Sequence, residues 1–477
     1  MSGRYIAGET KTRPGIYFRQ ESESNVQLNG VTDGVVAAAF KANWGPLGTV
    51  VEINSPAEIA EIFGDDSGSN SNVAMLTKIF IGGASQIKAV RVGSGGTKAA
   101  ITLKDTTADT AVDVVTLTAK FAGTRALSAT IKDSLTVATQ RQLIIYSGTK
   151  ELCAVNFEKG NAGEVDALVA AVNASDACVV TATKVAAGNG ILAAINQTTF
   201  TTAGASPTIA STDYDAAFTL LEAASWNTMC VDTNDSTIHA LVKAFIARAN
   251  DAGLMGLAVI GEPTNSTDFE THRARAASYN SENVIYCLNG FKIDDEVYEG
   301  FNAAAVLAGY IAYLPSNDSM THKVIPGATE VVFALTNTQV VNCLKSGCIV
   351  FSISSTGAVW VEQGINTLVN LSANQDEGWK KIRRTKTRFE LITRVNESSE
   401  GIIGSVNNDD NGRATFIAIA NGIINEMIAE GKLSSGSCEE DTLNPASGDS
   451  AWFIFNIVDL DSIEHVYLTY RFHFSED

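Results

Sequence analysis

The stretch MCVDTNDSTIHALVKAFIARANDAGLMGLAVI, residues 229–260, decides the fold class of this chain. It begins with an apolar strand at 229–231 and ends with another at 257–260. Between these strands, apolar residues recur at helical spacing, at Ile238, Leu241, Val242, Phe245, Ile246 and Ala249. A third apolar run, 284–288, follows at nearly the same interval. Fully apolar strands separated by helices are typical of a parallel sheet covered on both faces, so residues 213–314 are predicted to form a three-layer α/β unit.

Upstream of this unit, the predicted secondary structure changes from an α/β pattern to a β-rich one. Residues 30–96 alternate in an α/β manner, with strands predicted at 31–40 and 87–92 and helices beginning at Ser55-Pro56 and Val73. The run Gly93-Ser94-Gly95-Gly96 then marks a boundary. From 97 to 203 the chain is rich in Thr, Ala and Val, with short strands predicted at 112–117, 129–131 and 142–146. This pattern indicates an inserted β-rich, β-sandwich-like domain, followed by a linker at 204–211.

The last third, residues 366–477, is also predicted as α/β. An apolar stripe with a period close to 3.6 residues indicates a long helix, with cap candidates at Asp409, Asp410 and Asn411 and an end at Gly431. The residues of this stripe are Phe416, Ile417, Ala420, Ile423, Ile424, Met427 and Ile428.

Strand-like segments without an obvious local partner lie near both ends of the chain. In the polar arm 1–29, Ile16, Tyr17 and Phe18 form an apolar island between Arg13 and Arg19. Near the other end a period-2 strand is predicted, whose apolar face holds Val466, Leu468, Tyr470, Phe472 and Phe474. Each segment would serve either as an edge strand of its own domain or as a strand lent to a neighbouring subunit.

Composition excludes several classes of protein. A net charge of -19 over 477 residues argues against general nucleic-acid binding, because phosphates would be repelled. No apolar run reaches the roughly 18 to 20 residues of a membrane span, and the first residues lack the apolar core of a secretory signal. Seven scattered cysteines suggest buried free thiols and folding in a reducing cytoplasm. Cys343 and Cys348 lack the further ligands of a metal site, and no motif indicates a cofactor.

Catalytic motifs are weak. The run Gly93 to Lys98 lacks the spacing of a phosphate-binding loop. Asp232 and His239 would require a serine that no local motif supplies. An α/β hydrolase or nucleotide-binding enzyme remains an alternative, and it would require polar residues to converge near Asp232, Glu262 and Asn289. The chain is predicted not to be an enzyme.

A basic run stands out against the acidic remainder of the chain. Residues 380–394 carry a charge of +6, with only Glu390 opposing seven basic residues: Lys380, Lys381, Arg383, Arg384, Lys386, Arg388 and Arg394. A short extended piece followed by a helix is predicted here. The run is either a solvated charged face or a patch that binds an acidic partner.

Several segments, in order along the chain, resemble the contractile tail sheath family of phages and phage-derived bacteriocin particles, particularly those of Gram-positive hosts. The most specific is GSVNNDDNGRATFIAIANGIINEMIAEG, residues 404–431. The others are TRPGIYF (12–18), LTAKFAGTRALSATI (117–131), VIGEPTN (259–265), KVIPGATEV (323–331) and EQGINTL (362–368).

The resemblance implies an architecture: an N-terminal arm (1–29), an α/β segment joining the core (30–96), the inserted domain (97–203), a central α/β sheath domain (204–365) and a C-terminal α/β domain ending in a strand arm (366–477). The core would be subtilisin-like but without catalytic residues. The arm strands, including Arg13, would complete sheets in neighbouring subunits, and Lys380, Lys381, Arg383, Arg384, Lys386 and Arg388 would face an acidic tail tube.

The resemblance also implies a function. Subunits would assemble in the bacterial cytoplasm as six-membered rings stacked helically around the tube, bounded by baseplate and tail-terminator proteins. The sheath of a phage tail or of a released tail-like particle would then contract and drive the tube through a cell envelope. No cofactor, nucleic-acid partner or membrane insertion is implied. Another self-assembling phage component, such as a tube or capsid protein, is an alternative.

Overall fold

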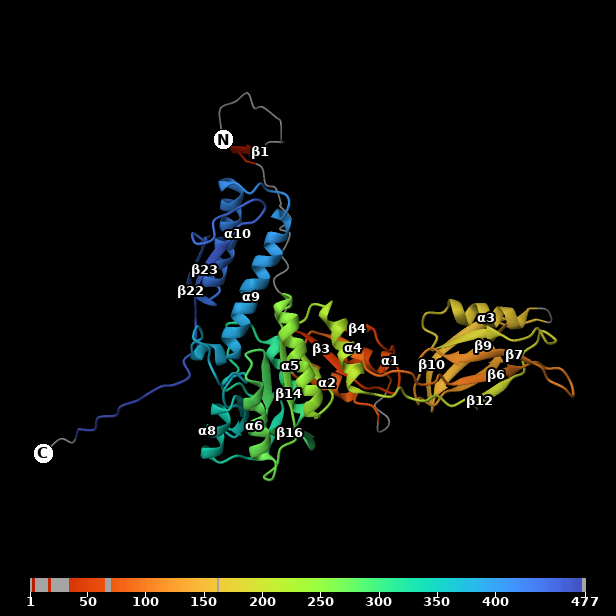
Figure 1. Cartoon of the computed structure of the whole chain (residues 1–477). Helices are drawn as coiled ribbons and strands as arrows, with labels where there is room; N and C mark the ends of the chain where they lie inside the picture. Colours follow the sequence, from red (N-terminus) through yellow and green to blue (C-terminus); the bar gives the residue numbers. More distant parts are fainter. Residues whose placement is uncertain (1, 5–15, 19–33, 65–69, 161–162, 474–477) are drawn as a thin grey trace.

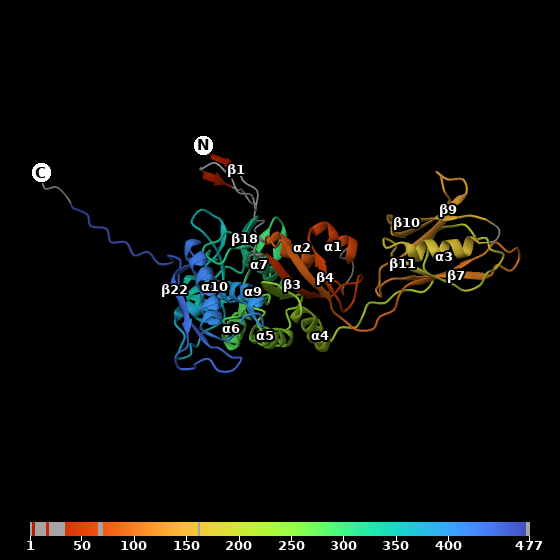
Figure 2. The same cartoon turned by 90° about the horizontal axis from the view of Figure 1, so that it is seen from above.

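The computed structural model describes residues 2–4, 16–18, 34–64, 70–160 and 163–473. A central α/β body lies between a β-rich domain on one side and a helical C-terminal domain on the other (Figure 1). The segment that ends at residue 473 runs away from the body in an extended form in both views (Figures 1 and 2). The chain is thus a mixed α/β protein of several domains, as its sequence predicts.

The central body is built on a seven-stranded sheet. In spatial order its strands are β19 (Cys348–Ile349), β15 (Val284–Cys287), β14 (Leu257–Gly261), β13 (Thr228–Val231), β3 (Val35–Phe40), β5 (Gln86–Arg91) and β4 (Val50–Ile53). Neighbouring strands are parallel except for the pair β4–β5 at one edge. The strands β3, β13, β14 and β15 are buried along their whole length. The parallel sheet predicted from residues 229–260 is confirmed.

Helices cover both faces of this sheet, each over its own hydrophobic core. One face carries α1 (Pro56–Ile62), α2 (Ala74–Ile81) and α7 (Phe301–Tyr313). The other carries α4 (Ser211–Glu222), α5 (Ser236–Asp251), α6 (Phe269–Tyr279) and α8 (Asn337–Lys345). Every apolar position predicted for the stripe of α5 is buried or packed against the core. The three-layer arrangement follows, since each strand presents apolar residues to both sides.

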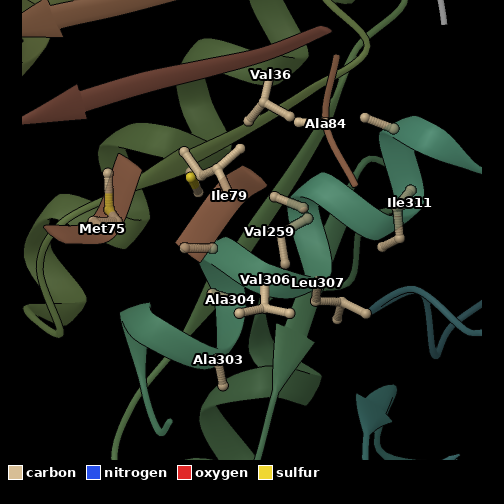
Figure 3. Close-up of a cluster of buried hydrophobic side chains, with 14 of the residues drawn as sticks. Val36, Met75, Ile79, Ala84, Val259, Ala303, Ala304, Val306, Leu307 and Ile311 are labelled. Atoms are coloured by element: carbon tan, nitrogen blue, oxygen red, sulfur yellow. The ribbon is translucent and has the colours of Figure 1, made fainter. Parts of the chain in front are cut away.

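Helix α7 shows how closely the layers approach. It packs against both α2 and the sheet, and Val306, Leu307 and Ile311 belong to the core that also holds Ile79 (Figure 3). A Cβ added at Gly309 would collide with the carbonyl oxygen of Ile79, and one at Gly82 with that of Val306. The backbones of α2 and α7 therefore touch where glycine leaves room.

We expect Gly309→Ala to lower the free energy of unfolding by about 1 to 3 kcal/mol, because the methyl group forces the two helices apart. Gly422, in α10 (Asp410–Ala429), is the matched control, since a Cβ added there would have no heavy atom within 4 Å. Gly422→Ala should be neutral or stabilise by up to about 1 kcal/mol. Urea unfolding of both variants measures the difference, and equal effects would contradict the close approach.

Two small antiparallel sheets are formed by residues 290–361 of the body. Strands β16 (Gly290–Ile293), β17 (Glu296–Tyr298) and β18 (Ala328–Val332) form an antiparallel sheet. A hairpin, β20 (Phe351–Ile353) with β21 (Val359–Val361), packs beside β18.

The β-rich domain is inserted between β5 and α4. One antiparallel sheet contains β10 (Lys150–Glu158), β9 (Gln140–Ser147), β8 (Ser128–Asp133) and β12 (Ile195–Thr199); the other contains β11 (Val180–Lys184), β7 (Asp113–Ala119) and β6 (Ala100–Lys104). Together with α3 (Glu164–Ala174) they enclose a separate core. The two connecting strands run side by side, bridged at Ser94–Thr208 and Thr97–Ala205.

The C-terminal domain consists of α9 (Ile382–Ser399), α10 and the hairpin β22 (Leu433–Glu440)–β23 (Phe453–Asp459). Asp409 caps α10 by accepting a hydrogen bond from the Gly412 N–H, as predicted. Of the extended piece predicted before α9, only Lys381 is extended, where it bridges to Ile365; residues 377–380 form a 3₁₀ turn that Asp376 caps by accepting from the Gly378 N–H. A second 3₁₀ turn, Glu400–Ile402, follows α9.

The predicted terminal strand does not form within the single chain. Residues 460–473 have no ladder partner among the described residues, and the segment runs away from the body (Figures 1 and 2). Phe474 lies outside the described residues. At the other end, β2 (Ile16–Phe18) pairs in parallel with β1 (Ser2–Arg4), so this island pairs within its own arm. Arg13 lies outside the described residues.

Candidate functional site

The carboxyl edge of the central sheet is the place to expect catalysis, and its polar groups are used internally. Asp232, after β13, is 1% exposed and accepts hydrogen bonds from the Tyr214 hydroxyl (2.6 Å), the Lys41 N–H (2.8 Å) and the Asn72 amide (3.0 Å). Burial raises the pKa of Asp232 despite these bonds. Asn289 is bonded to the backbone of Phe351 through both its amide oxygen and its amide nitrogen. Neither side chain is available to a substrate.

Glu262, after β14, is the centre of a second buried cluster. It accepts a hydrogen bond from the Tyr286 hydroxyl at 3.0 Å and pairs with Arg275, while His272 Nε2 lies 3.4 Å away. His239 is completely buried, and this burial lowers its pKa, so the imidazole is neutral. Its Nε2 lies 2.9 Å from the Thr233 carbonyl. The cluster ties α5 and α6 to the sheet.

Metal and membrane sites are not indicated by the side chains that can be placed. Within residues 2–4, 16–18, 34–64, 70–160 and 163–473, no group of His, Cys, Asp and Glu is arranged to hold a metal ion. Across the same ranges, no helix is long and apolar enough to cross a membrane.

The basic run lies along the first half of α9, where it joins the C-terminal domain to the central body. Lys386 donates to the carbonyl oxygens of Ile311 and Leu314, at the carboxyl end of α7. Positive charge is favourable there, because the helix dipole is negative at that end. Arg388 pairs with Glu282 at 2.6 Å and its guanidinium lies over the Trp379 ring. These cations bind groups of their own chain.

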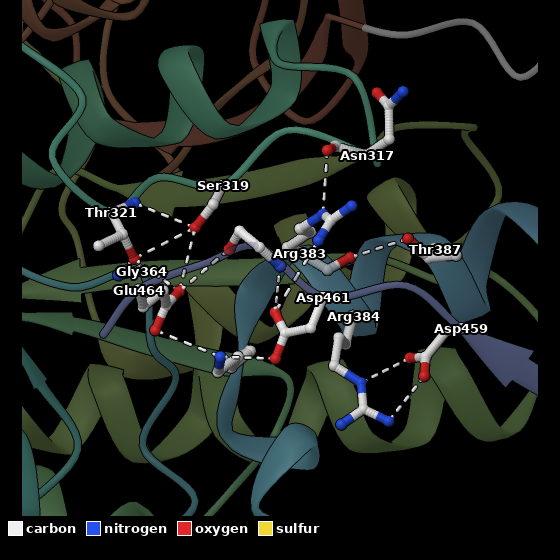
Figure 4. Close-up of polar contacts among 12 residues, drawn as sticks. Asn317, Ser319, Thr321, Gly364, Arg383, Arg384, Thr387, Asp459, Asp461 and Glu464 are labelled. Atoms are coloured by element: carbon white, nitrogen blue, oxygen red, sulfur yellow. Dashed lines mark hydrogen bonds and ion pairs between the residues drawn. The ribbon is translucent and has the colours of Figure 1, made fainter. Parts of the chain in front are cut away.

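Two further cations of the run bind acids at the end of the hairpin and just after it. Arg384 donates two hydrogen bonds to Asp459, at 2.6 and 2.7 Å, and Lys381 pairs with Asp461 at 2.6 Å (Figure 4). Arg383, 7% exposed, donates to the Asn317 carbonyl, and Lys380 pairs with Glu377. The predicted residues are therefore neighbours, but none of the six is fully exposed. Their charge is largely balanced inside the chain.

Glu464 completes this set of contacts. Its side chain is 4% exposed and accepts hydrogen bonds from Thr321 Oγ1 (2.9 Å) and Gln363 Nε2 (3.0 Å), with Lys381 Nζ at 3.2 Å. Burial alone would raise the pKa of Glu464, but these donors and the lysine hold it below its ordinary value. We call Asp459, Asp461 and Glu464 the C-terminal anchor. It fixes the point from which the last residues leave the body.

Beyond the anchor the chain exposes large apolar side chains. Val466 is 69% exposed, Tyr467 92% and Phe472 82%, and Leu468 and Tyr470 are exposed as well. The hairpin β22–β23 is a two-stranded sheet, so each of its strands leaves one edge unpaired within the described chain. One molecule thus carries both an unpaired segment with strand-forming residues and a hairpin with two open edges.

Sequence reasoning missed the anchor and the hairpin. The anchor was readable in principle, since Asp459, Asp461 and Glu464 are an acidic run that could balance the basic one. The hairpin was not, because LSSGSCEE in β22 lacks an apolar alternation; only Leu433 and Cys438 reach the core under α10.

Comparison with known proteins gives a consistent picture. Residues 208–367 match the family model described as the phage tail sheath protein central domain. The fold is similar to the sheath tail protein of Desulfitobacterium hafniense, with a TM-score of 0.68 and 19% identity over 94% of this chain and 100% of that one. It is also similar to a sheath tail protein of Listeria innocua (TM-score 0.67, 18% identity, 90% and 96% covered). The contracted helical sheath of the anti-feeding prophage matches with a TM-score of 0.53 and 10% identity, over 97% and 99% of the two chains.

Proposed function

We propose, from the match of residues 208–367 to the phage tail sheath protein central domain, that the chain is a structural subunit of a contractile tail sheath. Its subunits polymerise helically around an inner tube, and contraction drives the tube through the target envelope. The observation that carries the proposal is the sheath domain at 208–367 in a fold that matches whole sheath proteins from end to end. A structural role also suits a sheet whose carboxyl edge offers no open polar group at Asp232, Glu262 or Asn289.

Assembly through the arms is supported by the unpaired C-terminal segment. Residues 466–472 combine strand-forming side chains with high exposure, and a second copy of the hairpin offers the open edges that such a strand needs. Donation from one subunit to the next is heterologous, so it generates a helix or ring instead of a closed dimer. The N-terminal strand at Ile16, Tyr17 and Phe18 would exchange β1 for an edge of a neighbour.

A tube contact by the basic run is a narrower proposal. Lys381, Arg383 and Arg384 already bind groups of their own chain. In a contact with an acidic tube, carboxylates of the tube would therefore either displace the anchor residues from these cations or bind the cations together with them. Such a contact would be sensitive to salt. It would also couple tube binding to the position of the arm.

The remaining details follow from the family. We propose six subunits per ring, a tail tube, a baseplate and a terminator as partners, assembly in the bacterial cytoplasm, and a final place in a phage tail or a released tail-like particle. The parallel sheet with helices on both faces is compatible with a subtilisin-like core. The extended sheath would be a kinetic trap, released into a lattice with more contact area.

Negative-stain electron microscopy of the purified full chain tests the function. We expect hollow helical tubes or stacked rings, either from the chain alone or after co-expression with the tube protein of the same gene cluster. A monodisperse monomer in both preparations would contradict the proposal.

A further inference from the structure

We propose that Cys153 and Cys178, in the inserted domain, form a latent disulfide that closes when the protein leaves a reducing compartment. In the structure both are free, buried thiols, and their Sγ atoms lie 3.1 Å apart. A disulfide bond is about 2.05 Å long, so the sulfur atoms need to approach by only about 1 Å. The proposal concerns a covalent modification, and its chemistry is independent of sheath assembly.

Local structure places the two thiols together. Cys153 lies on β10, where a register shift between Glu151 and Cys153 resets the alternation of side chains, so that Cys153, Val155 and Phe157 all face the core. Cys178 follows α3 in a turn in which its N–H donates to the Ser175 carbonyl at 3.2 Å. The bond would tie β10, an edge strand of one sheet, to the residues just before β11, an edge strand of the other.

Cys178 is suited to be the attacking sulfur. The contact between the two thiols lowers the pKa of Cys178 and raises that of Cys153, and the Val180 and Val179 N–H groups and Lys120 also lower the pKa of Cys178, against the effect of burial. A thiolate, not a thiol, attacks a disulfide. Cys178 also lines an open cavity of about 590 Å³ between the inserted domain and the central body, together with Lys120 and Lys150. Although Cys178 is only 1% exposed, an oxidant in this cavity would lie beside its sulfur.

The exchange needs a low-molecular-weight disulfide as oxidant. The Cys178 thiolate attacks one sulfur of this oxidant, which forms a mixed disulfide and releases one thiol. Cys153 then loses its proton and attacks the Cys178 sulfur, which forms the Cys153–Cys178 bond and releases the second thiol. Two protein thiols are oxidised and one small disulfide is reduced.

A second cysteine pair provides an internal control. Cys343 on α8 and Cys348 on β19 are completely buried and in contact, and that contact raises the pKa of Cys348. Neither residue lines the cavity beside Cys178. Because neither sulfur of this pair borders that cavity, we expect the pair to stay reduced.

The test uses the full chain, purified with reductant, then freed of it and incubated with oxidised glutathione. We expect titratable thiols after denaturation to fall from seven to five, and digestion to yield a linked Cys153–Cys178 peptide. The oxidised protein should unfold at a higher temperature than the reduced protein. Cys153→Ser should trap glutathione on Cys178, whereas Cys178→Ser should leave Cys153 unmodified.

Two results would overturn the proposal: retention of all seven thiols, or a bond between Cys343 and Cys348 in place of the expected one. Circular dichroism of both serine variants shows that each has folded. Because the readout is thiol chemistry on the purified chain, it does not depend on polymerisation, and failure of either proposal leaves the other intact.

Discussion

A chain truncated after Glu464 is expected to fold and remain monomeric, and to lose the polymer completely. The anchor residues stay in place, so the contacts of Asp459, Asp461 and Glu464 with the body are kept. The loss removes the exposed apolar segment 466–472, which contributes little to the core of its own subunit. In a polymer, each donated strand adds a ladder of backbone hydrogen bonds and buried side chains to a neighbour. Sedimentation velocity and negative-stain microscopy distinguish the two states.

A point variant makes the same test without shortening the chain. Tyr470→Pro removes a backbone donor in the middle of the arm, and proline is excluded from paired positions of a strand. Leu135→Asp is the control, because Leu135 is 93% exposed in the inserted domain, away from the arm. We expect polymer loss only for Tyr470→Pro. Tubes of normal appearance from the truncated chain would exclude strand donation by this arm.

The fold of the central body could be predicted from the sequence because its strands are apolar on both faces and must be buried on both. Runs such as 229–231 and 257–260 are apolar on both sides, and α5 carries a regular stripe, so only burial between two helical layers satisfies both patterns. The same reasoning could not find where residues 466–472 lie. A strand is defined by its partner, and within the described part of one chain this segment has none.

The basic run shows a different limit. A charge count over a window of sequence treats every charged side chain as solvent-exposed. In the structure, Arg384 instead donates a hydrogen bond to Asp459, which lies 75 positions further along the chain. Long-range pairing of this kind depends on the fold that brings α9 beside the end of β23. A run that looks unbalanced in the sequence therefore has acidic partners already, and its role in any interface depends on how firmly those partners are held.

Arg384→Glu is expected to release the anchor and to lower the free energy of unfolding by about 2 to 4 kcal/mol, between the values of exposed and fully buried ion pairs. The side chains of Arg384 and Asp459 are 19% and 14% exposed, and the hydrogen bond with Asp459 raises the pKa of Arg384. Reversal places a carboxylate among Asp376, Asp459 and Asp461. Hydrogen–deuterium exchange should rise across residues 459–464, and assembly should fail because the arm leaves the body at no fixed point.

The exchanged pair Arg384→Glu with Asp459→Arg should recover part of this loss, because the attraction is restored with its sign reversed. Arg248→Glu is the matched control, since Arg248 pairs with Glu222 at 3.1 Å but is 51% exposed. Its reversal should cost about 1 kcal/mol or less and leave assembly unchanged. If the exchanged pair were as defective as Arg384→Glu alone, the defect would come from loss of the other contacts of Arg384 and not from loss of its ion pair with Asp459. Packing would then hold the anchor in place, and the proposal that tube carboxylates compete with Asp459 for Arg384 would lose its support.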